Sequence, residues 1–425
     1  MITHRIESVT QSGSASPKLN LGWMALGFTS PYYVPVAGSR LYLVEILLLL
    51  VVLFSLMQSV DRERWKLAAP FVPLGGLWLA GQMTSDSYRE VSLTTSLVVS
   101  ANIVLFVFDL VGLILVMTTG TIIRSVAIGA ALGGLAATVL QPNPNFHLAA
   151  WKFGYGLPVA ILVLVLLTGR KQLPQLGAFL ILLCIAVVNL LFDYRSLALI
   201  LALGAVIALR HRSRPRRIRG QVLRRRLLPL LAMSIVALFA FNSIYSSLAS
   251  SGALGEEASI RFTSQSVGAY GVVLGARKEV LAMGVSIADN PWLGAGSGAA
   301  LTREQYGRTL EILQNANYPL LAPDLAYLSQ RPLPAHSAFV GSWFLAGIAA
   351  VPFWLYFVFR LLDQLRNGLS GSRSYVALVI GAWLLAAIFF SPLGAEQRFI
   401  VALAVTALIT LAQSAEPNDA ERRRE

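Results

Sequence analysis

The chain has 425 residues, of which 56% are hydrophobic and 13% are charged, and its mean hydropathy is +0.66. Soluble globular domains carry about 25% charged residues, so this composition excludes an ordinary soluble protein and indicates a protein embedded in a lipid bilayer. The net charge of +13 would suggest nucleic acid in a soluble chain. Here the arginines lie between apolar segments, as in cytoplasmic loops of membrane proteins, so we expect no nucleic-acid partner.

Long apolar runs predict an all-α, polytopic fold with about 12 transmembrane helices. A helix of about 20 apolar residues crosses the hydrocarbon core and satisfies its own backbone hydrogen bonds. In chain order, the spans are expected at 21–37, 40–59, 67–83, 93–118, 121–140, 155–169, 174–192, 196–209, 227–246, 336–360, 375–391 and 398–413. Pro31 and Pro35 interrupt the first of them.

The loops between these spans predict the orientation. Basic residues follow the second, sixth, eighth and tenth spans and close the chain: Arg62, Arg64, Lys66, Arg170, Lys171, the block 210–226, Arg360, Arg366, Arg373 and Arg422–Arg424. All of them face the cytoplasm if both termini are cytoplasmic, and the opposite loops contain fewer Lys and Arg residues.

Three regions follow from this topology. Residues 1–246 hold the first nine spans, 247–335 form one large outer loop, and 336–425 hold the last three spans and a short cytoplasmic tail. The loop contains a polar helical stretch at 302–315, and we expect a helical cap on the membrane bundle rather than an independent domain. The chain shows no internal repeat, which argues against transporter folds built from inverted repeats.

Arg195 is the first candidate functional residue on the outer side. It directly precedes the apolar run 197–203, where a charge is costly unless it is paired or reached by water. Two interpretations stay open. Arg195 belongs to a functional site, or it has a structural role, either as an interfacial arginine whose head group reaches the membrane surface or as the partner of Asp193.

Three further residues on the outer side are candidates for a functional site. Arg277 and Lys278 precede a helix-like stretch that ends at 288, and His336 opens the tenth span after two prolines. Each of these has a structural alternative, as a solvated loop charge or an interfacial histidine. Together with Arg195 they favour a phosphate-bearing substrate, because the arginine fork matches phosphate and histidine deprotonates a hydroxyl near neutral pH.

Other kinds of site have little support. The four histidines and the single cysteine, Cys184, do not cluster at metal-ligand spacing, so we expect no metal. No phosphate-binding loop or dinucleotide fingerprint occurs, so we expect no cofactor. Gly294, Gly296 and Gly298 predict a tight turn with a close backbone approach.

Three motifs on the expected outer side resemble those of the O-antigen ligase and Wzy-type polymerase superfamily of bacterial envelope glycosyltransferases, and they occur in the same order along the chain. Arg195 and Leu199 have the Arg-x3-Leu spacing of the ligases, and His336 and Gly347 have their His-x10-Gly spacing. Between them, Arg277 is followed by Asp289-Asn-Pro-Trp-Leu-Gly-Ala-Gly296, similar to a turn in the large periplasmic loop of those enzymes.

The resemblance implies a fold like the C-class membrane glycosyltransferases, in the bacterial inner membrane, with the site facing the periplasm. It implies a metal-independent transferase that moves a glycan from an undecaprenyl-diphosphate carrier to an acceptor hydroxyl, lipid A-core being one acceptor. Arg195 and Arg277 would hold the donor pyrophosphate, and His336 would orient or deprotonate the acceptor. The expected supporting residues around them are Lys278, Asp193, Arg261, Gly294 and Gly296.

Alternatives remain within and outside this superfamily. A polymerase that extends one lipid-linked glycan with another, or a transferase with a protein acceptor, would use the same groups. The stretch 314–328 matches nothing in the superfamily, so the acceptor stays open. A lipid or glycan transporter would need charges at mid-membrane depth, and the predicted spans contain few besides Glu45 and Asp109.

Overall fold

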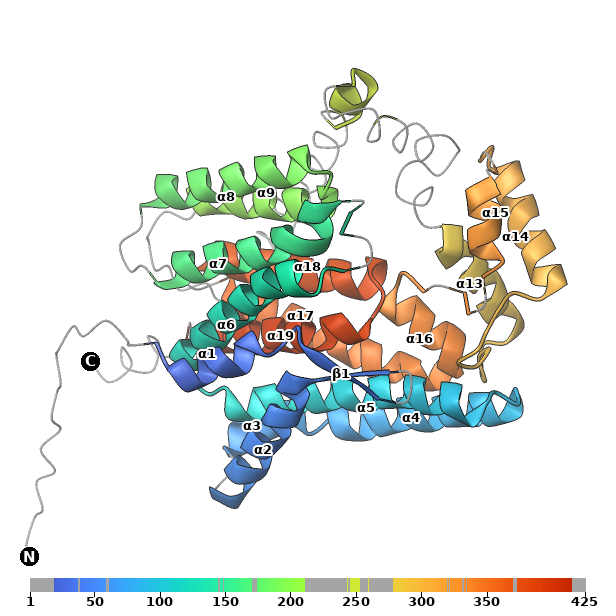
Figure 1. Cartoon of the computed structure of the whole chain (residues 1–425), viewed down its shortest axis with the longest axis horizontal. Helices are drawn as coiled ribbons and strands as arrows, with labels where there is room; N and C mark the ends of the chain where they lie inside the picture. Colours follow the sequence, from blue (N-terminus) through green and yellow to red (C-terminus); the bar gives the residue numbers. More distant parts are fainter. Residues whose placement is uncertain are drawn as a thin grey trace, which may run out of the picture.

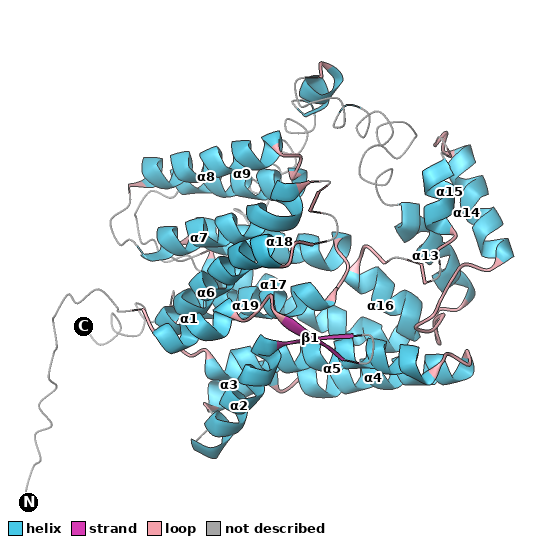
Figure 2. Ribbon diagram, viewed as in Figure 1, coloured by secondary structure: helices cyan, strands magenta, loops and turns pink. Residues whose placement is uncertain are grey.

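The apolar runs form helices, and 79% of the residues that the structure describes are helical. It is a computed structural model that describes residues 19–36, 39–58, 61–143, 146–147, 149–169, 174–210, 243, 245–252, 259, 278–318, 320, 322–330, 332–333, 335–369 and 373–414. Figure 1 shows the arrangement of the helices, and Figure 2 shows that the described part contains one small sheet.

The α-helices are α1 (Leu21–Phe28), α2 (Leu43–Gln58), α3 (Arg62–Ala68), α4 (Phe71–Tyr88), α5 (Leu93–Val116), α6 (Gly120–Leu140), α7 (Gly156–Gly169), α8 (Gln175–Leu191), α9 (Arg195–Arg210), α13 (Lys278–Asp289), α14 (Arg303–Asn315), α15 (Ala322–Leu328), α16 (Ala338–Ala346), α17 (Val351–Gly368), α18 (Ser374–Phe390) and α19 (Arg398–Gln413). Short helical turns are η1 (Trp151–Tyr155), η2 (Gly347–Ala350) and η3 (Ala395–Gln397), and the strands are β1 (Tyr33–Val36) and β2 (Ser39–Tyr42).

Within the described residues, five helical segments are long and apolar enough to cross a membrane: Leu93–Val116, Gly120–Leu140, Trp151–Gly169, Ala338–Gly368 and Ala395–Gln413. Their ends follow local chemistry. The Ser92 hydroxyl accepts from the Thr95 amide at 3.3 Å to cap α5, and the Thr119 hydroxyl does the same for Ile122 in α6. The all-α membrane architecture is thus supported, while the number of spans stays a prediction.

The first predicted span, 21–37, is not one helix. Helix α1 ends at Phe28, and β1 and β2 then form an antiparallel hairpin in which Pro35 pairs with Arg40. Pro31 cannot donate a helical hydrogen bond and disfavours helix at the residue before it, so the helix stops early.

Helix α1 packs against α6 through glycines. A Cβ atom on Gly27 would lie 2.1 Å from the Val126 carbonyl oxygen, and one on Gly129 would lie 2.0 Å from that of Met24. Only glycine permits this approach, and small residues are the usual contact between membrane helices.

The centre of the bundle is aromatic. Phe106 of α5 stacks on Trp354 of α17, with ring centroids 5.8 Å apart, and Trp78 of α4 lies 5.5 Å from Trp354. Phe353 and Phe357 complete the cluster. These contacts fix α4, α5 and α17 against one another.

Two buried arginines are satisfied inside the bundle. Arg64 donates to the carbonyl oxygens of Ile114, Met117 and Thr118 at 2.5–3.0 Å, at the C-terminal end of α5. Its charge also complements the helix dipole there. Arg398 has no exposed side-chain surface, and its Nη2 atom lies 2.6 Å from Oε1 of Glu45.

The predicted span 336–360 is interrupted. Helix α16 ends at Ala346, Gly347 has a φ of 68°, and the chain passes through η2 into α17.

Helices α13, α14 and α15 form a group beside α16 (Figure 1). The predicted polar helix at 302–315 is confirmed as α14, which begins after Thr302.

Candidate functional site

His336 lies beside a buried carboxylate and a phenol. Its Nδ1 atom is 2.6 Å from the Tyr327 hydroxyl and 3.4 Å from Oε1 of Glu279. The side chain of His336 is 35% exposed, whereas that of Glu279 is 6% exposed. The phenol is the hydrogen-bond partner of Nδ1, whereas the carboxylate at 3.4 Å forms an ion pair only with a protonated ring. A buried carboxylate at this distance favours the imidazolium that forms when a histidine accepts a proton, so the arrangement suits a general base.

Helix placement brings these residues together. Glu279 is in the first turn of α13, and Ala282 and Met283 of the same helix are buried in a cluster with Phe344 of α16. His336 directly precedes Ser337, whose hydroxyl caps α16 by accepting from the Val340 amide and donates to the Ile388 carbonyl at the end of α18. The packing of α13 against α16 therefore holds His336 beside Glu279.

Sequence reasoning missed Glu279 and Tyr327. Glu279 directly follows Arg277 and Lys278, so the sequence alone predicts a solvent-exposed charged residue at the start of a helix. A buried position in an amphipathic helix is the signal that could have found it: Glu279, Ala282, Met283 and Ser286 share the buried face of α13. Lys278, a predicted supporting residue, is buried at the start of the same helix.

Arg195 is paired, as one of the two interpretations expected. Its Nε atom donates to Oδ1 of Asp193 at 2.7 Å, and the same oxygen accepts from the Tyr245 hydroxyl at 3.1 Å. The guanidinium carbon lies 4.0 Å from the centre of the Tyr245 ring. The ion pair and the ring contact join the start of α9 to Tyr245.

The glycine stretch forms the predicted tight turn. Gly294 and Gly296 have φ values of 76° and 80°. The amides of Ala295 and Gly296 donate to the carbonyl oxygens of Phe344 and Leu345 at 2.7 and 3.0 Å. The two glycines thus dock the loop on the end of α16, and their supporting role is to position the backbone.

A buried acid on α4 locks this turn in place. Oδ1 of Asp86 accepts from the Ser297 amide at 2.6 Å, and Oδ2 accepts from the Ser297 hydroxyl at 2.7 Å. Arg89 donates to the Gly294 carbonyl at 3.1 Å. The end of α4 therefore anchors the segment that follows Asp289, a contact that the sequence did not predict.

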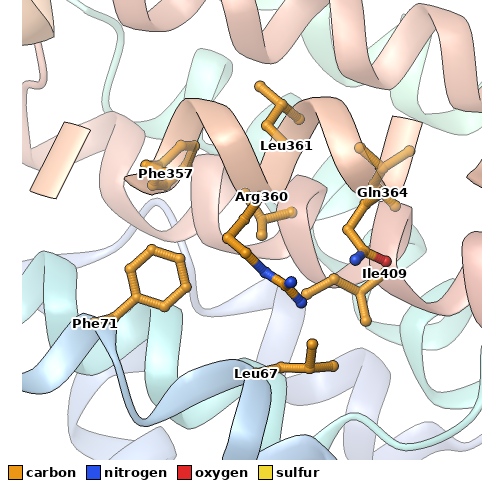
Figure 3. A pocket seen from close by; sticks show the side chains of 9 residues that line it. Leu67, Phe71, Phe357, Arg360, Leu361, Gln364 and Ile409 are labelled. Atoms are coloured by element: carbon orange, nitrogen blue, oxygen red, sulfur yellow. The ribbon is translucent and has the colours of Figure 1, made fainter. Parts of the chain in front are cut away.

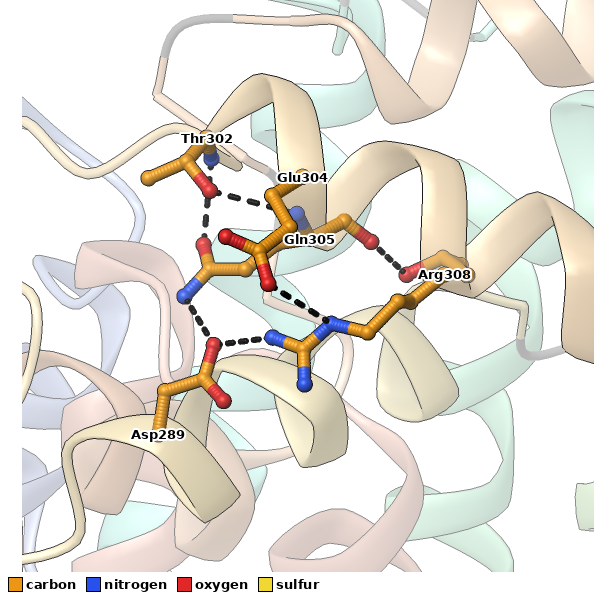
Figure 4. A network of polar contacts seen from close by, with 6 residues as sticks. Asp289, Thr302, Glu304, Gln305 and Arg308 are labelled. Atoms are coloured by element: carbon orange, nitrogen blue, oxygen red, sulfur yellow. Dashed lines mark hydrogen bonds and ion pairs between the residues drawn. The ribbon is translucent and has the colours of Figure 1, made fainter.

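Asp289 joins α13 to α14 (Figure 4). Its Oδ2 atom accepts from Gln305 Nε2 at 2.9 Å and from Arg308, while Gln305 also completes a capping box with Thr302. The hydrogen bonds from Arg308 and Gln305 hold the pKa of Asp289 below its usual value. Among the described residues no group of three or more metal-ligating side chains occurs, and Asp289 is a structural link.

Among the described residues, Arg195 and His336 take part in separate sets of contacts. Arg277 and Arg261 lie outside the described residues. Of the hydrogen bonds and ion pairs between described residues, none joins the Arg195 group to the His336 group.

Buried charges also occur within the bundle. The Glu45 carboxylate accepts hydrogen bonds from Arg398 and, at 2.8 Å, from the Tyr42 amide. Arg398 also donates to the side-chain oxygen of Asn102. Asp109 is fully buried, and its carboxylate has no hydrogen-bond partner among the described residues. The Glu45–Arg398 pair joins α2 to α19, which is a structural role for one of the two acids noted in the sequence.

One pocket lies between α4, α17 and α19 (Figure 3). Phe71, Phe357 and Ile409 form apolar walls, and Arg360 lies beside them. Its volume of about 20 Å³ holds about one water molecule, so it is too small for a glycan or a lipid chain.

No protein-family model and no curated protein sequence matches this chain.

Proposed function

We propose that this chain transfers a glycan from an undecaprenyl-diphosphate carrier to an acceptor hydroxyl at the outer face of a bacterial inner membrane. The observation that carries the proposal is the contact between His336 and the buried Glu279. A histidine beside a carboxylate can accept the proton of a hydroxyl group. His336 directly follows the large loop, at the position where the resemblance expects the histidine of the His-x10-Gly spacing.

The proposed reaction needs one proton transfer and one displacement. His336 takes the proton of the acceptor hydroxyl, and the oxygen attacks the anomeric carbon of the donor sugar. The bond from that carbon to the diphosphate oxygen breaks, and undecaprenyl diphosphate leaves with the bonding electrons. Arg195 and Arg277 would stabilise the negative charge on the leaving group, as preorganised donors do elsewhere. The donor carries its own leaving group, so the reaction consumes no nucleotide.

Contacts between loops support the proposed topology. With both termini in the cytoplasm, the segments 84–91, 141–154, 192–195 and 247–335 are expected on the outer side, and the structure shows contacts between them. Trp151 stacks on Phe192 at 5.2 Å and donates to Asn189 at 3.1 Å, which joins the segment before α7 to the α8–α9 turn. Asp86, at the end of α4, holds Ser297 of the large loop. Segments assigned to one side by their charge therefore adjoin at two places.

The test is transfer by the purified full-length protein in detergent. The donor is an undecaprenyl-diphosphate-linked glycan, and separate reactions contain lipid A-core, a second lipid-linked glycan or an acceptor protein. Product with lipid A-core would support the ligase, and product with a lipid-linked glycan alone would indicate the polymerase. We expect activity in EDTA and loss of turnover in His336→Ala. Full transfer by His336→Ala, or no product with any acceptor, would overturn the proposal.

A further inference from the structure

A larger apolar cavity lies between helices α6, α7, α18 and α19. Its volume is about 170 Å³, and its walls include Leu164, Trp383 and Leu403. Apolar cavities of about 150 Å³ stay dry and take up hydrocarbon. The cavity is therefore suited to an acyl chain rather than to a polar metabolite.

One end of this cavity is basic. Arg124 of α6 and Arg373, directly before α18, both line it, and their charges repel each other. Both side chains are half-buried. Arg124 donates to the Gly120 carbonyl at 3.2 Å and to the Thr121 hydroxyl at 3.5 Å, which are neutral groups of its own helix.

No acid in the described part of the chain lies within 4.0 Å of either guanidinium. Arg373 also stands at the N-terminus of α18, where the helix dipole disfavours a cation. Two like charges in this position are stabilised by an anion between them, and the guanidinium fork matches a phosphate group.

The basic end lies far from His336. The far end of α18 is held to Ser337 through the Ile388 carbonyl. Arg373 directly precedes α18 and is 15 residues before Ile388, or about 22 Å at the rise of an α-helix. The cavity thus has its anion-binding groups at the membrane surface opposite the candidate base.

We propose that this cavity binds an anionic phospholipid of the leaflet at that surface. The lipid phosphate lies between Arg124 and Arg373, and one acyl chain occupies the apolar space. Basic pockets between membrane helices on the cytoplasmic side bind anionic headgroups in this way. The site is independent of glycan transfer, because none of its residues belongs to the His336 or Arg195 groups.

The test is native mass spectrometry of the full-length protein with phosphatidylglycerol or phosphatidylcholine of identical acyl chains. We expect preferential retention of phosphatidylglycerol. The double variant Arg124→Gln/Arg373→Gln should lose about tenfold or more of that preference, since it removes both charged donors to the phosphate. Arg366→Gln is the matched control, because Arg366 is exposed in the last turn of α17. If the double variant does not fold, Arg373→Gln alone should lose part of the preference.

A second variant tests the cavity itself. Ala404→Phe fills space that lines the cavity, so it should weaken retention of both lipids, whereas Ala25→Phe on the exposed face of α1 should not. Equal retention of the two lipids by the wild type, or an unchanged preference in the arginine variants, would overturn the proposal. So would displacement of phosphatidylglycerol by inorganic phosphate alone, or by equimolar undecaprenyl phosphate, because the occupant would then be a free anion or the glycan carrier.

Discussion

The Nδ1 atom of His336 lies 3.4 Å from Oε1 of Glu279, although 57 positions separate the two residues in the chain. The contact joins the start of α13 to the residue that precedes the cap of α16. It makes Glu279 a positioning residue for the proposed base, and it can be tested separately from the base itself.

Glu279→Gln should lower kcat by about 10² or more and leave the donor KM nearly unchanged, because the amide cannot stabilise the imidazolium that forms during transfer. Glu279→Asp keeps the charge and should recover part of the rate. Steady-state kinetics of glycan transfer provide both constants. Glu304→Gln is the control, since Glu304 is 84% exposed and lies 4.0 Å from Arg308. A Gln variant with wild-type kcat would remove Glu279 from the mechanism.

Arg195→Lys should raise the donor KM and lower kcat, because lysine keeps the charge but loses the fork that matches phosphate. Arg277→Lys should have the same effect. The ion pair with Asp193 allows a sharper comparison. If Arg195 served only to pair with Asp193, then Asp193→Asn would impair transfer as much as Arg195→Lys. We expect the Asp193 variant to be milder, and equal losses would contradict the phosphate-binding role.

Gly347→Ala should disrupt the contact between the large loop and α16 and lower the stability of the protein. Gly347 has a φ of 68°, and a Cβ atom there would lie 2.1 Å from the Trp292 carbonyl oxygen. Backbone strain of this kind costs about 1–3 kcal/mol before the clash is counted. The melting temperature in detergent should fall, together with transfer. Gly307→Ala is the matched control, because its Cβ would meet nothing within 4 Å and alanine favours the helix by about 1 kcal/mol. A Gly347→Ala protein as stable as the wild type would show that the loop docks in another way.

Asp289 should make the α13–α14 link dependent on pH. The pKa of Asp289 is lowered in the folded protein, chiefly by the hydrogen bond from Arg308. The ionised carboxylate therefore stabilises the fold at pH values above the unfolded pKa near 3.8, and this contribution is lost as the pH falls below that value. Asp289→Asn should therefore melt at a lower temperature than the wild type at pH 7. The difference between the two proteins should shrink as the pH falls below 3.8, and it should vanish once the carboxyl group is protonated in the folded protein as well. A difference that persists unchanged at pH 3 would exclude the carboxylate as its source.

Cysteine labelling should test the orientation in intact cells. Cys184 is exposed and must first be replaced by alanine. Single cysteines at Ser251 and Ser329, both exposed in the large loop, should react with an impermeant reagent, and a cysteine at Ser213 in the basic block should not. Ser337 is unsuitable, because its side chain is buried and caps α16. Labelling at Ser213 would reverse the topology and place His336 in the cytoplasm.

Several features of the fold are local, and the sequence alone predicted them. The apolar runs around Leu93–Val116 and Gly120–Leu140 specify helices long enough to cross a bilayer, because an unpaired backbone is costly in hydrocarbon. The glycines at 294 and 296 specified a tight turn, because only glycine adopts positive φ without strain. For Arg195, the sequence named both the residue and its partner Asp193, two positions away, but left the pairing open.

The remaining features depend on packing between distant segments. Hydropathy does not show that Gly347 breaks the tenth predicted span, because the break follows from the approach of the Trp292 carbonyl. Hydropathy also does not predict that Asp86 binds Ser297, 211 positions away, or that Arg124 and Arg373 lie at one end of a cavity. Glu279 is an ordinary charge at a helix start until α13 docks on α16 and buries it beside His336. Local propensity determines where helices form, whereas only the packing of those helices decides which polar groups lose water and must find one another.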